Sequence, residues 1–439
     1  MQWNKLLSKQ RIGKEIVSEI SQDRSEFQKD FDRIIFSSAF RRLQDKTQVF
    51  PLSRSDYVRT RLTHSLETSS VGRSLGYMAG SRLIDKHGLD LMPAEPATVV
   101  ATACLMHDIG NPPFGHSGED AIRDWFESTP TGQSLCTWID KKRRSDFKMF
   151  EGNAQGLRNV LVLQRPNSRG GMQLTCATLA AFTKYPFTSE HAGNKKKFGI
   201  FSSEVDTYAE IADHLGLVRD AGNRWARHPF AYLVEAADDI CYHVVDMEDG
   251  HRLGLVSFDD LYGMFMEILD YNPAIVDRVQ GISEEKEKIE YLRAATINNL
   301  VTSSCEVFME NEEAILAGTF SSSLTEQIGK ATEFSLLKKV AIEKVYNSTE
   351  VIDTEAAAYE VLWKILDFYG QIVCELHKDG KLGAKSKKSI KLLPDDYKPS
   401  EDLTVYENTQ KIVDYVSGMT DAFAVRTFNK ISGISLLRR

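Results

Sequence analysis

A histidine–aspartate pair, His107-Asp108, ends an apolar segment of the 439-residue chain. Residues 99–106 are almost wholly apolar, and a glycine and two prolines follow at 110–113, which stops a helix there. The carbonyl end of a helix favours a cation, and a carboxylate buried beside an imidazole is costly unless it is paired or binds a metal. The pair therefore suggests two metal ligands. For such a pair standing alone, a satisfied core histidine or a helix cap is the commoner explanation.

Two further side chains can complete a ligand set. His64 lies in an amphipathic segment three residues after Arg61, and Asp238 lies within an apolar one. Asp238, Tyr242 and Asp246 are spaced four residues apart, so a helix presents all three on one face. Two imidazoles and two carboxylates suit one divalent ion with open positions for water and substrate. Mn²⁺ or Mg²⁺ is favoured, with iron, nickel or zinc as alternatives; an exposed acid is the competing interpretation of Asp238.

His116 and Glu119 form a second pair, spaced i, i+3 where Gly115 lets the chain turn into a new helix. A nearby carboxylate holds the tautomer of an imidazole and raises its basicity, as at most catalytic histidines. From these residues alone, a contact that merely caps the helix is an equal alternative.

Helical periodicity runs through most of the chain, and strand alternation is rare. We therefore expect an all-α fold in a single composite unit, with at most a small β-hairpin in 378–402. The front part should carry the chemistry, and the rear part should pack on it. The expected helices that matter most are 60–85, 96–109, 230–247, 356–376 and 409–428.

The composition excludes several classes of protein. Six scattered cysteines without a Cys-x-x-Cys pair form neither a disulfide framework nor a zinc ribbon, which indicates a reducing compartment. No segment is typical of a signal peptide or long enough in apolar residues to span a membrane, so we expect a cytoplasmic protein. The net charge of -8 argues against a protein that mainly coats nucleic acid.

Seven stretches in chain order resemble the bacterial deoxyguanosine triphosphate triphosphohydrolases, which are HD-domain phosphohydrolases. His64, His107, Asp108 and Asp238 resemble the metal-binding set of that superfamily, and Asn111 stands where many of its sequences carry a further histidine. The resemblance implies an HD-domain helical fold, with a catalytic core in 1–270 and a helical region in 271–439 that packs on it. The stretches are 38–43, 46–51, 59–65, 107–116, 151–156, 235–250 and 417–421.

The activity implied by the resemblance is metal-dependent hydrolysis of dGTP at the α-phosphorus, which gives a deoxynucleoside and inorganic triphosphate. His116 would donate a proton to the leaving 5′-oxygen, and Glu119 would orient it. Arg61 would bind the α-phosphate, since guanidinium groups suit phosphates best. Lys184, Tyr185, Lys197 and Asn153 would bind the distal phosphates, although a lysine run such as 195–197 is more often a solvated loop.

Sugar recognition also follows the resemblance. Gln48 and Asp246 would bind the 3′-hydroxyl group. Val49 and the Tyr242 ring would fill the space that a 2′-hydroxyl needs, which gives preference for deoxynucleotides. For Tyr242, ordinary core packing is the competing interpretation.

The resemblance further implies a homo-oligomer, hexameric or tetrameric, and single-stranded DNA as an effector. Two rival functions remain. One keeps the metal core but acts on all dNTPs or on other nucleotides, including cyclic ones. The other is a non-catalytic regulator that binds nucleotides or single-stranded DNA.

Overall fold

The computed structural model describes residues 1–14, 24–48, 59–194, 196–220, 222–347 and 349–434. Within these ranges it contains α-helices and isolated β-bridges but no β-sheet, which confirms the expected all-α fold. The first helices are α1 (Trp3–Leu6), α2 (Glu26–Ile35), α3 (Ser38–Arg42), α4 (Arg61–His87), α5 (Ala94–Met106), α6 (Gly115–Ser128), α7 (Pro130–Trp138), α8 (Lys141–Lys148) and α9 (Gly152–Arg158). The middle of the chain forms α10 (Cys176–Phe182), α11 (Val205–Leu215), α12 (Pro229–Arg252), α13 (Phe258–Ile268), α14 (Pro273–Gln280), α15 (Glu285–Glu310) and α16 (Glu312–Ala317). The last helices are α17 (Ala331–Val340), α18 (Thr349–Asp379), α19 (Ala384–Ser389), α20 (Val405–Ser417) and α21 (Asp421–Ile431).

Helices α4 and α5 pack closely because α4 carries glycines where the two meet. Gly72, Gly76 and Gly80 are spaced four residues apart and so share one face of α4. A Cβ atom on Gly72 would lie 2.4 Å from the sulfur of Cys104, and one on Gly80 would lie 2.3 Å from a ring carbon of Pro96. This close packing brings the first turn of α4 beside the last turn of α5.

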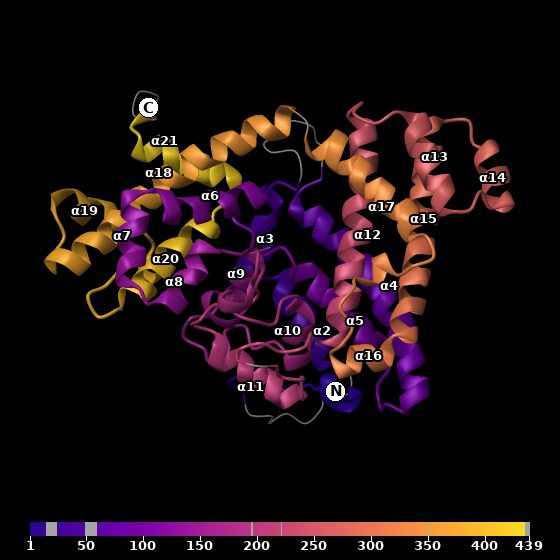
Figure 1. Cartoon of the computed structure of the whole chain (residues 1–439), viewed down its shortest axis with the longest axis horizontal. Helices are drawn as coiled ribbons and strands as arrows, with labels where there is room; N and C mark the ends of the chain where they lie inside the picture. The colour runs from indigo at the N-terminus through magenta and orange to yellow at the C-terminus, as the bar shows by residue number, and fades with distance from the viewer. Residues whose placement is uncertain (15–23, 49–58, 195, 221, 348, 435–439) are drawn as a thin grey trace.

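The buried apolar residues form two clusters, which divide the molecule in Figure 1 into a right and a left part. The first cluster gathers around α4, α5, α12 and α15. The second joins α6, α7 and α8 to α18, α20 and α21, so residues 114–154 share a core with 358–424. The proposed division of the chain at residue 270 stays a prediction, and each cluster draws on both sides of that point.

Four of the five expected helices are found: α4, α5, α12 and α18 correspond to 60–85, 96–109, 230–247 and 356–376. The prediction of one helix over 409–428 is wrong, because the chain breaks between Ser417 and Asp421 into α20 and α21. The expected excursion at 378–402 contains the short helix α19 and no hairpin among its described residues. None of the described helices is long and apolar enough to cross a membrane.

Candidate active site

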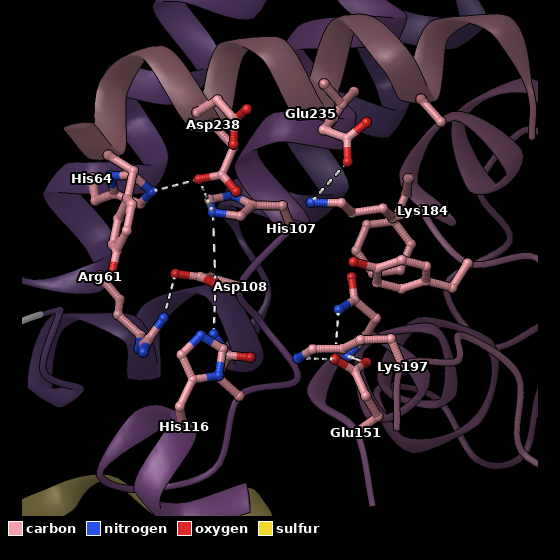
Figure 2. A pocket seen from close by; sticks show the side chains of 18 of the residues that line it. Arg61, His64, His107, Asp108, His116, Glu151, Lys184, Lys197, Glu235 and Asp238 are labelled. Atoms are coloured by element: carbon pink, nitrogen blue, oxygen red, sulfur yellow. Dashed lines mark hydrogen bonds and ion pairs between the residues drawn. The ribbon is translucent and has the colours of Figure 1, made fainter. Parts of the chain in front are cut away.

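Three helices bring together the four expected metal ligands (Figure 2). Ligand atoms of His64, His107 and Asp108 lie within 4.8 Å of one another. Asp238 completes the group from α12, with Oδ1 at 3.1 Å from His64 Nε2 and 3.4 Å from His107 Nε2. The sequence-predicted set of ligands therefore converges on one point of the structure.

Local structure fixes how each ligand faces that point. Thr60 and Thr63 form a reciprocal capping box that starts α4 and places His64 in its first turn. His107 lies at the C-terminal cap of α5, where its Nδ1 is 2.7 Å from the carbonyl oxygen of Cys104. If Nδ1 donates its proton to that carbonyl, Nε2 keeps a lone pair for a metal ion. The two imidazole nitrogens and two carboxylates are thus a donor set that fits a divalent cation.

The Asp108 carboxylate is held by two neighbours besides the imidazoles. Arg61 Nη1 donates to its Oδ2 at 2.6 Å, and Asn111 Nδ2 donates to its Oδ1 at 2.5 Å. Burial alone would raise the pKa of Asp108, but Arg61 and the imidazoles of His107 and His64 lower it to about 2. The carboxylate is therefore ionised, and Asn111 serves to orient it.

A tight turn of the backbone at Phe114 and Gly115 positions His116 at the site. Phe114 and Gly115 both have positive φ angles, 63° and 60°. A positive φ is rare for an aromatic residue such as Phe114. A Cβ atom on Gly115 would lie 2.6 Å from Nη2 of Arg61, so only glycine lets the arginine pass this close. The turn starts α6 with His116 in its first turn and its side chain 74% exposed.

His116 and Glu119 form the expected pair. Nδ1 of His116 lies 3.1 Å from Oε2 of Glu119, which is 2% exposed. The hydrogen bond and the charge of Glu119 raise the pKa of His116. Burial alone would raise the pKa of Glu119, but His116 together with Lys197 and Arg123 lowers it to about 2. A buried, ionised carboxylate thus favours the protonated form of an exposed imidazole.

The cations expected to bind phosphates line the same cavity, each beside a carboxylate. Lys197 Nζ donates to Oε1 of Glu151 at 2.8 Å and lies 3.6 Å from Glu119. Lys184 Nζ lies 3.3 Å from Oε1 of Glu235 and over the Tyr185 ring, at 5.7 Å from its centroid. The cavity measures about 310 Å³. Its walls include these expected site residues: Gln48, Arg61, His64, His107, Asp108, His116, Glu119, Asn153, Lys184, Tyr185, Lys197, Asp238 and Tyr242.

The expected sugar-binding residues are placed less uniformly. Gln48 lines the cavity, and its Oε1 is buried without a hydrogen-bond partner in the described part of the chain. Tyr242 also lines it, whereas Asp246 is 2% exposed and is not among the described lining residues. Burial raises the pKa of Asp246 well above its usual range, and its Oδ2 accepts a hydrogen bond of 3.0 Å from Tyr346. Val49 lies outside the described residues.

Several residues at the site were not singled out from the sequence. Glu151 is fully buried and accepts hydrogen bonds from the backbone N–H and side-chain amide of Asn153. Tyr346 stacks on Tyr242 with ring centroids 5.0 Å apart and planes at 21°. Glu151 lies two residues before Asn153, which was predicted to bind phosphate, so the sequence could have indicated Glu151 as well. Tyr346 ends a π-helical turn one hundred residues after Asp246, and nothing local in the sequence marks it.

Comparisons with known proteins agree with this arrangement. Residues 61–143 match the HD domain model, and 324–430 match the phosphohydrolase-associated domain model. The chain is 40% identical, over 99% of its length and all of the relative's, to a deoxyguanosinetriphosphate triphosphohydrolase-like protein of Synechocystis. It is 38% identical over 99% of both chains to a protein described by the same words in Pseudomonas aeruginosa. It is 33% identical to the deoxyguanosinetriphosphate triphosphohydrolase of Salmonella arizonae, over 93% of this chain and 94% of that one.

Proposed function

Because the chain belongs to the deoxyguanosinetriphosphate triphosphohydrolase family of HD-domain proteins, we propose that it hydrolyses dGTP at the α-phosphorus. Water attacks phosphorus, the bond from phosphorus to the 5′-oxygen breaks, and deoxyguanosine and inorganic triphosphate leave. The observation that carries the proposal is one cavity lined by the four metal ligands, the His116–Glu119 pair and three cationic side chains.

A divalent ion, Mn²⁺ or Mg²⁺, bound by His64, His107, Asp108 and Asp238 would supply positive charge for the α-phosphate. Arg61 contributes a second positive charge beside it, because its guanidinium lies 2.6 Å from the Asp108 carboxylate. Such fixed charges stabilise a transition state without reorganisation.

His116 acts as the general acid in this proposal. Its raised pKa favours the protonated ring, and Glu119 holds Nδ1 so that Nε2 is left to face the leaving 5′-oxygen. Protonation of that oxygen lets deoxyguanosine leave as a neutral alcohol.

Lys184, Tyr185, Lys197 and Asn153 hold the distal phosphates. Lys184 and Lys197 already lie at the cavity wall through their pairs with Glu235 and Glu151. A triphosphate brings more negative charge than either carboxylate, so the lysines gain a stronger partner without leaving the wall. Gln48 offers the 3′-hydroxyl a buried oxygen that has no hydrogen-bond partner among the described residues. The Tyr242 ring lines the cavity and would exclude a 2′-hydroxyl, and the family resemblance adds Val49 to this role.

The remaining parts of the proposal rest on the family and, for the location, on the free cysteines. They are preference for guanine among the bases, a hexameric or tetrameric assembly, tuning by single-stranded DNA and a cytoplasmic location. The division into a core of 1–270 and a packing region of 271–439 also belongs here.

The test offers each of the four dNTPs with Mn²⁺ or Mg²⁺ and resolves phosphate, pyrophosphate and tripolyphosphate by ion exchange. We expect tripolyphosphate and deoxyguanosine in equal amounts, with dGTP the fastest substrate and no turnover after chelation of the metal. Equal rates on all four dNTPs would replace dGTP by a broad substrate class. Release of pyrophosphate or phosphate, or binding of single-stranded DNA without any nucleoside product, would overturn the proposal.

A further inference from the structure

The turn between α20 and α21 contacts two segments of the chain, around Thr47 and Phe114, that lead to residues of the cavity wall. Asp421, the first residue of α21, is 2% exposed and uses both carboxylate oxygens. Its Oδ2 accepts hydrogen bonds from the backbone N–H and the hydroxyl of Thr47, at 3.0 and 2.6 Å. Its Oδ1 accepts one from the backbone N–H of Phe114 at 3.0 Å. One carboxylate therefore joins two segments that are far apart in sequence.

Each of these segments leads directly into the active site. Thr47 precedes Gln48 and forms a β-bridge with Thr60, the cap residue of α4 that precedes Arg61. Phe114 is the first of the two residues with positive φ that deliver His116. A bulky residue in this conformation persists only where its surroundings hold it there. The hydrogen bond that the Phe114 backbone N–H donates to Asp421 is such a restraint.

A second contact of the same turn reinforces the arrangement. Lys46 is 3% exposed, and its ammonium donates to the carbonyl oxygen of Ser417 at 3.0 Å and to that of Asn111. Asn111 in turn orients the Asp108 carboxylate. Through Asp421 and Lys46, both almost wholly buried, the turn 417–421 is thus joined to residues 46–47 and to the segment 111–114.

We propose that Asp421 is a positioning residue that holds the Gln48 segment and the His116 turn at a fixed separation. The inference rests on the proposed function, since it assigns to those two segments the sugar and the proton donor. Displacement of a reacting group by about 1 Å can cost about 100-fold in rate. Asp421 touches neither substrate nor metal in this proposal and acts only through Thr47 and Phe114.

Asp30 is a control for the loss of a buried carboxylate that accepts hydrogen bonds from a threonine, and its Oδ1 also accepts one from Arg11 at 2.5 Å. It is fully buried, and its Oδ2 accepts hydrogen bonds from the N–H and hydroxyl of Thr175 at 3.0 and 2.7 Å, the same pattern that Asp421 makes with Thr47. It is not among the described residues that line the cavity. Asp421→Asn and Asp30→Asn each replace a buried carboxylate by an amide, so both should lower the melting temperature.

The experiment compares the two variants with the wild type by hydrogen exchange of peptides covering 43–48 and 111–119, and by the steady-state kinetics of triphosphate release. We expect Asp421→Asn to speed exchange in both peptides, to lower kcat by about 10- to 100-fold and to change its pH profile. Asp421→Glu should restore part of kcat, and Asp30→Asn should leave both peptides and kcat close to wild type.

Unchanged exchange in both peptides of Asp421→Asn would overturn the proposal. So would faster exchange with unchanged kcat, KM and pH profile, because Asp421 would then be merely structural. An equal loss of kcat in Asp30→Asn would have the same meaning. If the wild type releases no triphosphate from any dNTP, the proposed function fails. Exchange of the Thr47 and Phe114 amides then still decides whether Asp421 holds both segments.

Discussion

Glu119 Oε2 accepts the hydrogen bond from His116 Nδ1 at 3.1 Å, and the two side chains differ sharply in exposure, 2% against 74%. The buried member is a carboxylate whose pKa lies at about 2, and the exposed member is an imidazole whose pKa is raised. The exposed imidazole therefore takes its raised pKa from a carboxylate that is almost wholly buried.

This relationship predicts a pH dependence. A general acid works only while protonated, so kcat should fall as the pH rises through the raised pKa of His116. Glu119→Gln removes the negative charge that raises this pKa, so the alkaline limb of kcat should move to lower pH. Asp120→Asn, a change at the adjacent and exposed residue, should leave the limb in place. A limb that stays fixed in Glu119→Gln would show that another group controls it.

Removal of the acid itself separates binding from chemistry. His116→Ala should lower kcat by about 10²- to 10⁴-fold, the usual contribution of a positioned acid or base. Metal content and nucleotide affinity should stay at wild-type levels, because His116 is not one of the four proposed metal ligands. Measurement of bound metal by mass spectrometry and of dGTP affinity by calorimetry checks both points. Loss of metal in this variant would place His116 among the ligands.

The Tyr242 ring predicts discrimination between dGTP and GTP. It lines the cavity and is supported from behind by the stacked ring of Tyr346. Tyr242→Ala should open space for a 2′-hydroxyl and raise kcat/KM for GTP relative to dGTP. Tyr242→Phe keeps the ring and should keep the ratio. If Tyr242→Ala leaves the ratio unchanged, the ring is no gate.

The buried ion pairs of Arg158 predict that this residue contributes more to the free energy of unfolding than the exposed Arg169 does. Arg158 pairs with Asp414 and Glu204, which are 1% and 4% exposed, and so ties α9 to α20. Arg158→Met should cost about 3–5 kcal/mol of unfolding free energy because it leaves buried carboxylates unpaired. Arg169→Met breaks the exposed pair with Glu210 and should cost at most about 1 kcal/mol. Chemical denaturation compares the two, and similar losses would contradict this assignment.

Three of the proposed metal ligands, His107, Asp108 and Asp238, could be predicted from the sequence because they stand out within an apolar helix or beside a helix stop. The His107-Asp108 pair followed by Gly110 is such a signal, and so is Asp238 within an apolar helix. The i, i+3 spacing of His116 and Glu119 likewise survives folding, since one helix carries both.

Contacts between residues that are distant in the sequence could not be predicted from local residue patterns. The hydrogen bond that Tyr346 donates to Asp246, and those that Thr47 and Phe114 donate to Asp421, join residues at least one hundred positions apart. The break at Gly418 was also missed, because the apolar spacing continues across it from α20 to α21. Periodicity records which face of a helix is buried but not where the partner face comes from.

The most direct measurement of the central claim is turnover of dGTP in water enriched in ¹⁸O, with mass spectrometry of both products. Attack of water at the α-phosphorus places one ¹⁸O atom in inorganic triphosphate and none in deoxyguanosine. Appearance of ¹⁸O in deoxyguanosine would contradict the account of this site. So would phosphate or pyrophosphate, carrying the ¹⁸O, as the primary product in place of triphosphate.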